Sequence, residues 1–142
     1  MQTTGVTNTK IGVEASGFYS SYDTVNSRKH YYLKCYTDNS VVHLARFNQT
    51  INLTGYNYLK FEAYALEFPD SDSSYVGVGV STSSTVTATS SLAAYTTISD
   101  VGGIGIVNIS SLSGNYYIYL ICRHNASSDD YSSITNIFLS KT

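Results

Sequence analysis

The chain has 142 residues, of which 42% are hydrophobic and only 13% are charged, and its formal net charge is −2. This length and hydrophobic content favour one folded domain over a disordered chain. No apolar run reaches the roughly 20 residues of a membrane helix, and Asp and Glu outnumber Lys and Arg. We therefore expect neither a membrane nor a nucleic acid as a partner.

The N-terminal part of the chain is polar and then changes to a strand-like pattern. Residues 1–10 are predicted to form a flexible segment, followed by a single β-sandwich domain over residues 11–142. Apolar and polar residues alternate with a period of two from residue 11 onward, whereas helical periodicity is missing. A first strand is expected at 11–19 and a polar loop at 20–29.

Further strands follow at regular spacing. The segments 30–37 and 41–47 flank the turn signal Asp38-Asn39 and are predicted to pair as a hairpin. The Ser- and Thr-rich segment 83–91 is either an exposed edge strand or a mobile loop. The remaining expected strands are 50–53, 58–67, 75–81, 93–98, 104–109, 116–123 and 133–140. Many short strands separated by turn signals predict an all-β sandwich or barrel.

Alternation within these strands divides the side chains into an inner and an outer face. The inner face is apolar. It comprises Leu59, Phe61, Ala63 and Ala65 in one strand, Tyr116, Ile118, Leu120 and Cys122 in another, Tyr31, Leu33 and Cys35 in a third, and Val76, Val78 and Val80 in a fourth. The outward set comprises Tyr58, Lys60, Glu62 and Tyr64 in one strand, Tyr117, Tyr119, Ile121 and Arg123 in another, and Tyr32, Lys34 and Tyr36 in a third. Gly77 and Gly79 also point outward, and two glycines there predict a shallow trough.

Outward tyrosines beside charged residues are typical of a surface that binds sugars. Aromatic rings stack on the apolar face of a pyranose, while charged groups bind its hydroxyls. The candidate ligand-binding residues are Tyr64, Tyr117, Tyr119, Arg123, Tyr32 and Tyr36. The alternative is that the tyrosines only form cross-strand pairs or cover a neighbouring domain.

The residues that commonly carry catalysis are scattered. His30, His43 and His124 lie far apart in the sequence, no GxSxG motif is present, and no pair of carboxylates stands out. We therefore expect no enzyme activity, no cofactor and no metal. The acidic pairs around Asp70 and Asp129 are interpreted as turn residues rather than calcium ligands.

The two cysteines, Cys35 and Cys122, alternate with apolar residues in two of the expected strands. This pattern predicts two buried, unpaired thiols that pack as small hydrophobic side chains. A disulfide between them is the alternative.

Two stretches carry a resemblance to a known family: INLTGYNYLKF at 51–61, and VNISSLSGNYYIYL at 107–120 with the closing strand ITNIFL at 134–139. They resemble the jelly-roll, galactose-binding-like accessory domains of tail and minor structural proteins of phages and prophages of gut-dwelling Gram-positive bacteria. The resemblance spans residues 11–140 and consists mostly of turns and core alternation. It implies a jelly-roll β-sandwich but no particular ligand residue.

The resemblance also implies a role. The expected function is a non-catalytic binding module on a virion appendage or extracellular surface, which recognises a host cell-surface glycan. The alternative is a purely structural module that packs against neighbouring domains or copies of the appendage.

Overall fold

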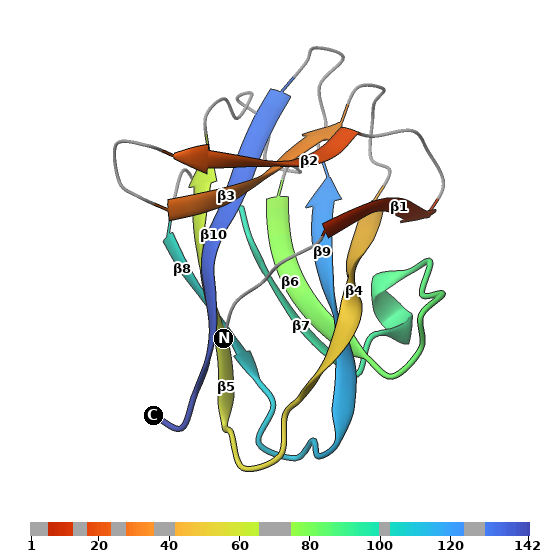
Figure 1. The fold of residues 1–142 in the computed structure, drawn as a ribbon, viewed down its shortest axis with the longest axis vertical. Coiled ribbons are helices and arrows are strands. Elements are labelled where there is room, and N and C mark those ends of the chain that lie inside the picture. Colours follow the sequence, from red (N-terminus) through yellow and green to blue (C-terminus); the bar gives the residue numbers. More distant parts are fainter. Residues whose placement is uncertain are drawn as a thin grey trace.

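The computed structural model describes residues 6–12, 17–23, 28–35, 42–65, 75–99, 103–123 and 130–142, with side chains for 42–63, 75–99, 103–123 and 134–142. The described residues form two five-stranded sheets (Figure 1). Sheet A has the strand order β1-β4-β9-β6-β7, and sheet B has the order β2-β3-β10-β5-β8. The elements are β1 (Val6–Gly12), β2 (Gly17–Asp23), β3 (Arg28–Cys35), β4 (His43–Asn52), β5 (Tyr58–Ala65), β6 (Tyr75–Ser81), the 3-10 turn η1 (Thr89–Ser91), β7 (Ala94–Ile98), β8 (Gly103–Asn108), β9 (Asn115–Arg123) and β10 (Asp130–Ser140).

All strand pairs are antiparallel, and the chain passes repeatedly between the two sheets. β3 pairs with β2 and β10, whereas β4 pairs with β1 and β9. The predicted all-β jelly-roll sandwich is thus confirmed. The predicted hairpin between 30–37 and 41–47 is wrong, because the chain changes sheets there.

Several strand boundaries also differ from those predicted. The expected first strand at 11–19 is two strands, β1 and β2, and β1 already begins at Val6, within the expected flexible segment. The segments 41–47 and 50–53 belong to one strand, β4, whose register with β9 shifts between Arg46 and Thr50. This irregularity interrupts the alternation of inward and outward side chains, which is why the sequence pattern predicts two strands where the structure has one.

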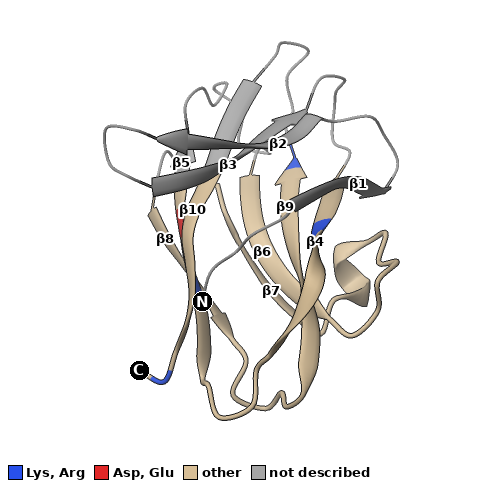
Figure 2. Cartoon of the chain, viewed as in Figure 1, with Lys and Arg blue, Asp and Glu red and all other residues tan. Residues whose placement is uncertain are grey.

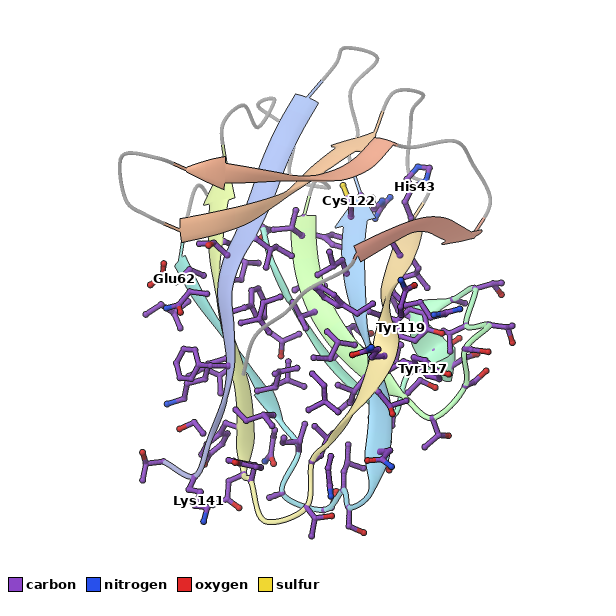
Figure 3. All side chains as sticks on the ribbon, in the orientation of Figure 1. His43, Glu62, Tyr117, Tyr119, Cys122 and Lys141 are labelled. Atoms are coloured by element: carbon purple, nitrogen blue, oxygen red, sulfur yellow. The ribbon has the colours of Figure 1, made fainter. Side chains whose placement is uncertain are left out.

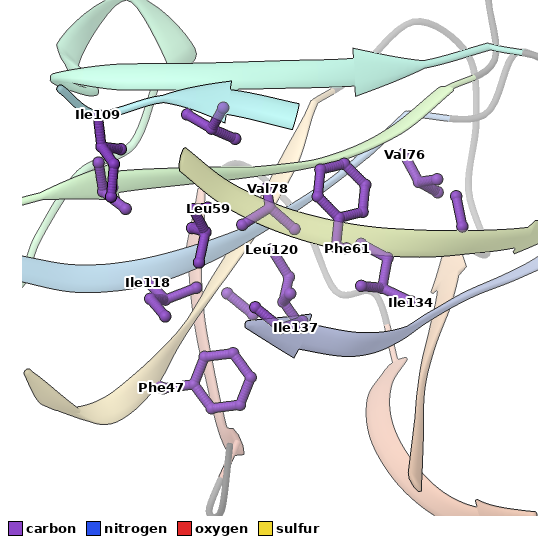
Figure 4. Close-up of a cluster of buried hydrophobic side chains, with 14 of the residues drawn as sticks. Phe47, Leu59, Phe61, Val76, Val78, Ile109, Ile118, Leu120, Ile134 and Ile137 are labelled. Carbon is purple, nitrogen blue, oxygen red and sulfur yellow. The ribbon is translucent and has the colours of Figure 1, made fainter. Parts of the chain in front are cut away.

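The main core lies between the two sheets (Figure 4). The inward prediction is confirmed for nine residues of β5, β6 and β9 that are buried in this core: Leu59, Phe61, Ala63, Val76, Val78, Val80, Ile118, Leu120 and Cys122. Tyr116 of the same set is partly buried and packs against the core, and the side chain of Ala65 lies outside the described part of the chain. Cys122 is 0% exposed, as expected of a thiol that packs as a hydrophobic side chain. The side chain of Cys35 lies outside the described part of the chain.

An irregularity in β10 turns one aromatic side chain outward. The register of β10 with β5 shifts between Thr135 and Phe138, and Asn136 has φ of 50°. Asparagine tolerates this left-handed conformation better than most residues. The extra residue places both Ile134 and Ile137 in the core and leaves Phe138 36% exposed on the outer face of sheet B.

The two sequence stretches that carry the family resemblance meet at one end of the sandwich. The backbone N–H of Leu53 donates to the carbonyl of Gly114 (2.9 Å), and the N–H of Gly114 donates to Oγ1 of Thr54 (2.8 Å). Gly55 and Gly114 have φ of 87° and 93°, which favours glycine. The residues behind the resemblance therefore build a corner of the fold.

Replacing Thr54 with valine tests this corner. Thr54→Val keeps the side-chain shape but removes the acceptor for Gly114, so we expect a loss of about 0.5–1.5 kcal/mol in unfolding free energy, the usual net value of one hydrogen bond. Urea denaturation measures the change. Thr87→Val, at an exposed position between β6 and β7, is the control and should have a smaller effect.

Candidate functional site

The structure divides the candidate ligand-binding residues between two sheets. Tyr117, Tyr119 and Arg123 lie on β9 of sheet A, whereas Tyr32 and Tyr64 lie on β3 and β5 of sheet B. A single sugar platform built from all of them is therefore wrong. Tyr36 lies outside the described residues.

On sheet A, the segment 82–93 between β6 and β7, here called the strap, covers part of the outer face. Figure 1 shows the strap with its 3-10 turn beside β4 and β9. Tyr119 lies beneath it: its hydroxyl donates to the carbonyl of Ser83 (2.6 Å) and accepts from the N–H of Val86 (3.1 Å). Tyr119 is 0% exposed, so its prediction as an exposed sugar-binding ring is wrong.

Further contacts hold the strap on the sheet. Nε of Arg46 donates to the carbonyl of Ser84 (2.9 Å), and the guanidinium of Arg46 lies 4.9 Å from the ring centre of Tyr117. Figure 3 shows Tyr117 and Tyr119 on the side of β9 next to the strap. Below the strap, Leu44, Val86, Tyr119 and Ile121 form a second, smaller core. The outer face of β9 is thus largely a buried surface.

Burial also changes the acidity of Tyr119. Loss of hydration raises the pKa of its hydroxyl above the ordinary 10.0, and the hydrogen bond from Val86 partly opposes this rise. Because the folded-state pKa is raised, the stabilisation from Tyr119 is complete below about pH 10 and declines as the pH rises through the folded-state value. At neutral pH the hydroxyl is protonated and donates to Ser83.

The strap also fills half of the trough predicted at Gly77 and Gly79. A Cβ placed on Gly79 would lie 2.7 Å from Cδ1 of Leu92, which belongs to the strap. At Gly77, a Cβ would overlap the carbonyl oxygen of Thr96 in the adjacent β7. Both glycines are needed for close packing, and neither forms an open trough by itself.

Next to the strap, the outer face of sheet A carries two tyrosines and an arginine, which we call the Tyr75 cluster: Tyr75, Tyr95 and Arg123. Tyr75 is partly buried and packs against the smaller core under the strap. Tyr75 and Arg123 are opposite each other in the β6–β9 register, and the guanidinium lies 5.9 Å from the Tyr75 ring centre. Tyr95 lies on the edge strand β7 and is 46% exposed. Between the rows of the two tyrosines, the strands carry Gly77 and the exposed Thr97.

Arg123 is the charged residue of the cluster, and burial and charge act in opposite directions on Tyr75. Burial raises the pKa of Tyr75 above 10.0, Arg123 partly offsets the rise by charge and a hydrogen bond, and Tyr95 adds a smaller upward contribution. Tyr75 is therefore a neutral hydroxyl at pH 7. Charged groups are sparse among the described residues (Figure 2), and the charged side chains described for sheet A are Arg46 and Arg123.

The outer face of sheet B has a different character. In the register of β10, Ser133 lies between Tyr32 of β3 and Tyr64 of β5, so these two candidate residues share one row of the sheet. Their side chains lie outside the described part. Further along, the apolar side chains Ile104 and Ile106 are 67% and 49% exposed, beside the partly exposed Phe138. Lys60 lies among them, 5.7 Å from the ring centre of Tyr58.

The sequence prediction identified Arg123 but missed Tyr75 and Tyr95. Tyr75 alternates with Gly77 and Gly79 and was therefore identifiable as an outward residue of the same strand. Tyr95 follows the same rule in β7, where Ala94 and Ile98 pack against the core. The three residues share one face of neighbouring strands because of the strand order, which alternation does not encode.

Within the described ranges, no group of three or more His, Cys, Asp or Glu side chains lies close enough together to hold a metal ion. His43 is buried in β4, at 2% exposed. None of the helical segments described for the chain has the length and apolar character needed to cross a membrane.

Solved structures share the fold of this chain. The glycoside hydrolase domain of Endo-D from Streptococcus pneumoniae R6 matches with a TM-score of 0.60 and 16% identity, over 94% of this chain and 21% of that one. The chain thus spans about a fifth of the Endo-D structure. No protein-family model matches the chain. No curated protein matches it either.

Carbohydrate-binding modules match over most of their own length. The family 11 module of a cellulosomal cellulase from Clostridium thermocellum has a TM-score of 0.54 and 8% identity, over 98% of this chain and 91% of that one. The family 11 module from the same organism, in complex with a β-1,3-1,4-mixed-linked tetrasaccharide, has a TM-score of 0.53 and 10% identity, over 96% and 91%. At these identities the likeness shows a shared jelly-roll, galactose-binding-like fold.

Proposed function

We propose that this chain is a non-catalytic carbohydrate-binding module and that the Tyr75 cluster is its sugar-binding surface. The observation that carries the proposal is the exposed ring of Tyr95 on the same outer face of sheet A as the Tyr75–Arg123 pair. The fold shared with carbohydrate-binding modules over nearly the whole chain supports it.

The physical basis is the combination of aromatic surface and fixed polar groups. A tyrosine ring covers the apolar face of a pyranose and keeps a hydroxyl for hydrogen bonding. Arg123 supplies several N–H donors for sugar oxygens, while its contact with Tyr75 limits its freedom before binding. The strap covers the outer face over Tyr119 and Gly79, so it limits the ligand to the part of sheet A that it leaves uncovered.

Removal of the Tyr95 ring tests the proposal. We expect Tyr95→Ala to lower the affinity for the bound glycan about tenfold or more, because an aromatic contact is worth about 0.5–1.5 kcal/mol beyond the area that it buries. Binding of the wild type to an array of plant, bacterial and host-surface glycans identifies the ligand, and titration calorimetry measures the change.

The matched control is Tyr58→Ala on sheet B, which removes a partly exposed tyrosine from the opposite side of the sandwich. We expect this variant to bind as the wild type does. Equal binding by wild type and Tyr95→Ala, with Tyr58→Ala impaired, would move the site to sheet B.

A second candidate function is packing against another protein surface. The exposed Ile104, Ile106 and Phe138 on sheet B favour it, because apolar side chains that gather on one face mark contact surfaces. This role is compatible with sugar binding, since the two surfaces lie on different sheets. Analytical ultracentrifugation of the isolated chain tests whether copies associate through this face.

We place the module on a phage tail or related surface appendage, where many copies act together. The support is the resemblance of the corner residues, such as Thr54 and Gly114, to appendage domains. A single shallow site binds weakly, and display of linked copies raises avidity by roughly 10² to 10⁴. Binding of host cells by a multimerised chain, compared with the monomer, tests this setting.

A further inference from the structure

We propose that the Tyr75 cluster selects glycans that carry an oxyanion, either a carboxylate or a sulfate ester. This inference rests on the proposed function and names the ligand class of the same site. It follows from three features of Arg123. Its Nε has no hydrogen-bond acceptor among the described residues, no acidic side chain accompanies it in the described part of sheet A, and its guanidinium contacts Tyr75.

The first feature is a donor that the protein leaves without an acceptor. Nε of Arg123 is buried and has no hydrogen-bond partner among the described residues. A guanidinium offers five N–H donors, and a buried donor without a partner costs free energy. Because no acceptor among the described residues binds Nε, the charge of the guanidinium remains available to a strong acceptor at its exposed part.

The second feature is that no carboxylate accompanies Arg123 among the described side chains of its sheet. Within the described side chains of sheet A and the strap, the charged groups are Arg46 and Arg123, and no carboxylate accompanies them. Arg46 already donates to the carbonyls of Ser84 and Phe47. Glu62, the acidic residue among the described side chains, lies on β5 of sheet B (Figure 3). Arg123 is thus the cation that faces the ligand.

The third feature is the fixed position of Arg123. Tyr75 interacts with the guanidinium through its ring and its hydroxyl, and the raised pKa of that hydroxyl leaves it neutral. A neutral phenol holds the arginine in place without cancelling its charge. Carboxylate and sulfate oxygens bind a guanidinium through short, charge-assisted hydrogen bonds, which sugar hydroxyls do not form.

The test compares polymers with matched backbones and different substituents. Affinity electrophoresis of the whole chain uses hydroxyethyl cellulose, carboxymethyl cellulose and cellulose sulfate, and then dextran, carboxymethyl dextran and dextran sulfate. We expect the wild type to prefer at least one anionic polymer over its neutral counterpart by about 10- to 100-fold, the value of a hydrogen bond to a charged group. The carboxylate and sulfate arms distinguish the two sources of the anion.

Arg123→Gln should lose this preference and bind the neutral and anionic polymers alike. Lys60→Gln removes the same charge from sheet B and should keep the preference, which excludes a general effect of net charge. Arg123→Lys keeps the charge but lacks the planar set of N–H donors, so it should retain only part of the preference for anionic polymers. Circular dichroism confirms that each variant is folded.

Two results would overturn the inference: equal binding of neutral and anionic polymers by the wild type, or an unchanged preference in Arg123→Gln. Either result leaves the proposed sugar-binding function in place if Tyr95→Ala still weakens binding. Failure of the wild type to bind any polymer here or any glycan on the array would instead reject the proposed function itself.

Discussion

Gly105→Ala is expected to destabilise the protein by about 3 kcal/mol or more. Gly105 lies opposite Phe61 in the β5–β8 register, and a Cβ on Gly105 would overlap the Phe61 ring. Phe61 is fully buried and cannot retreat without displacing other core side chains. Overpacking of a core usually costs about 1–3 kcal/mol, and this overlap involves a rigid ring.

A double-mutant cycle measures the coupling. Phe61→Ala alone should cost about 3–5 kcal/mol, whereas adding Gly105→Ala to that background should cost far less than in the wild type, because the ring is gone. Lys60→Ala, one residue away and partly exposed, should change the unfolding free energy by no more than about 0.5 kcal/mol. Additive costs for Gly105→Ala and Phe61→Ala would contradict the described packing.

Tyr119→Ala is expected to cost about 3–5 kcal/mol, as for a fully buried aromatic side chain. The substitution empties the small core under the strap and removes the hydroxyl that bonds Ser83 and Val86. Chemical denaturation measures the loss. Limited proteolysis should then cut the strap more readily than in the wild type, because its main attachment is gone.

Tyr119→Phe separates the two contributions. It keeps the ring and removes the hydroxyl, so the N–H of Val86 loses its acceptor, and we expect a cost of about 1–3 kcal/mol. A cost below 1 kcal/mol for Tyr119→Ala would show that the strap does not rest on this side chain.

The inner face of the sandwich was predictable because burial follows the pleat of each strand. Phe61 and Leu120 were placed inward correctly, since one buried face repeats with a period of two. Strand partners were not predictable in this way. The alternation of β3 and β4 reads the same whether the two strands pair or lie in different sheets, so the expected hairpin was wrong.

The prediction that Tyr119 is an exposed sugar-binding ring was wrong for a different reason. Alternation placed it outward correctly, but outward does not mean exposed when a loop from elsewhere in the chain covers that face. A signal was present: the run from Tyr116 to Cys122 is apolar on both faces, which is typical of a strand buried on both sides. Phe138 is the opposite case. Strict alternation from the buried Ile134 would place Phe138 inward, but the irregular residue Asn136 shifts the pattern by one residue and turns Phe138 outward.

The most direct test of the sugar-binding surface is a nuclear magnetic resonance titration of the labelled chain with the tightest-binding oligosaccharide from the glycan array. We predict the largest chemical-shift changes at Tyr75, Gly77, Tyr95, Thr97 and Arg123 on sheet A. Changes confined to Tyr58, Lys60, Ile106 and Phe138 on sheet B would contradict this assignment of the site.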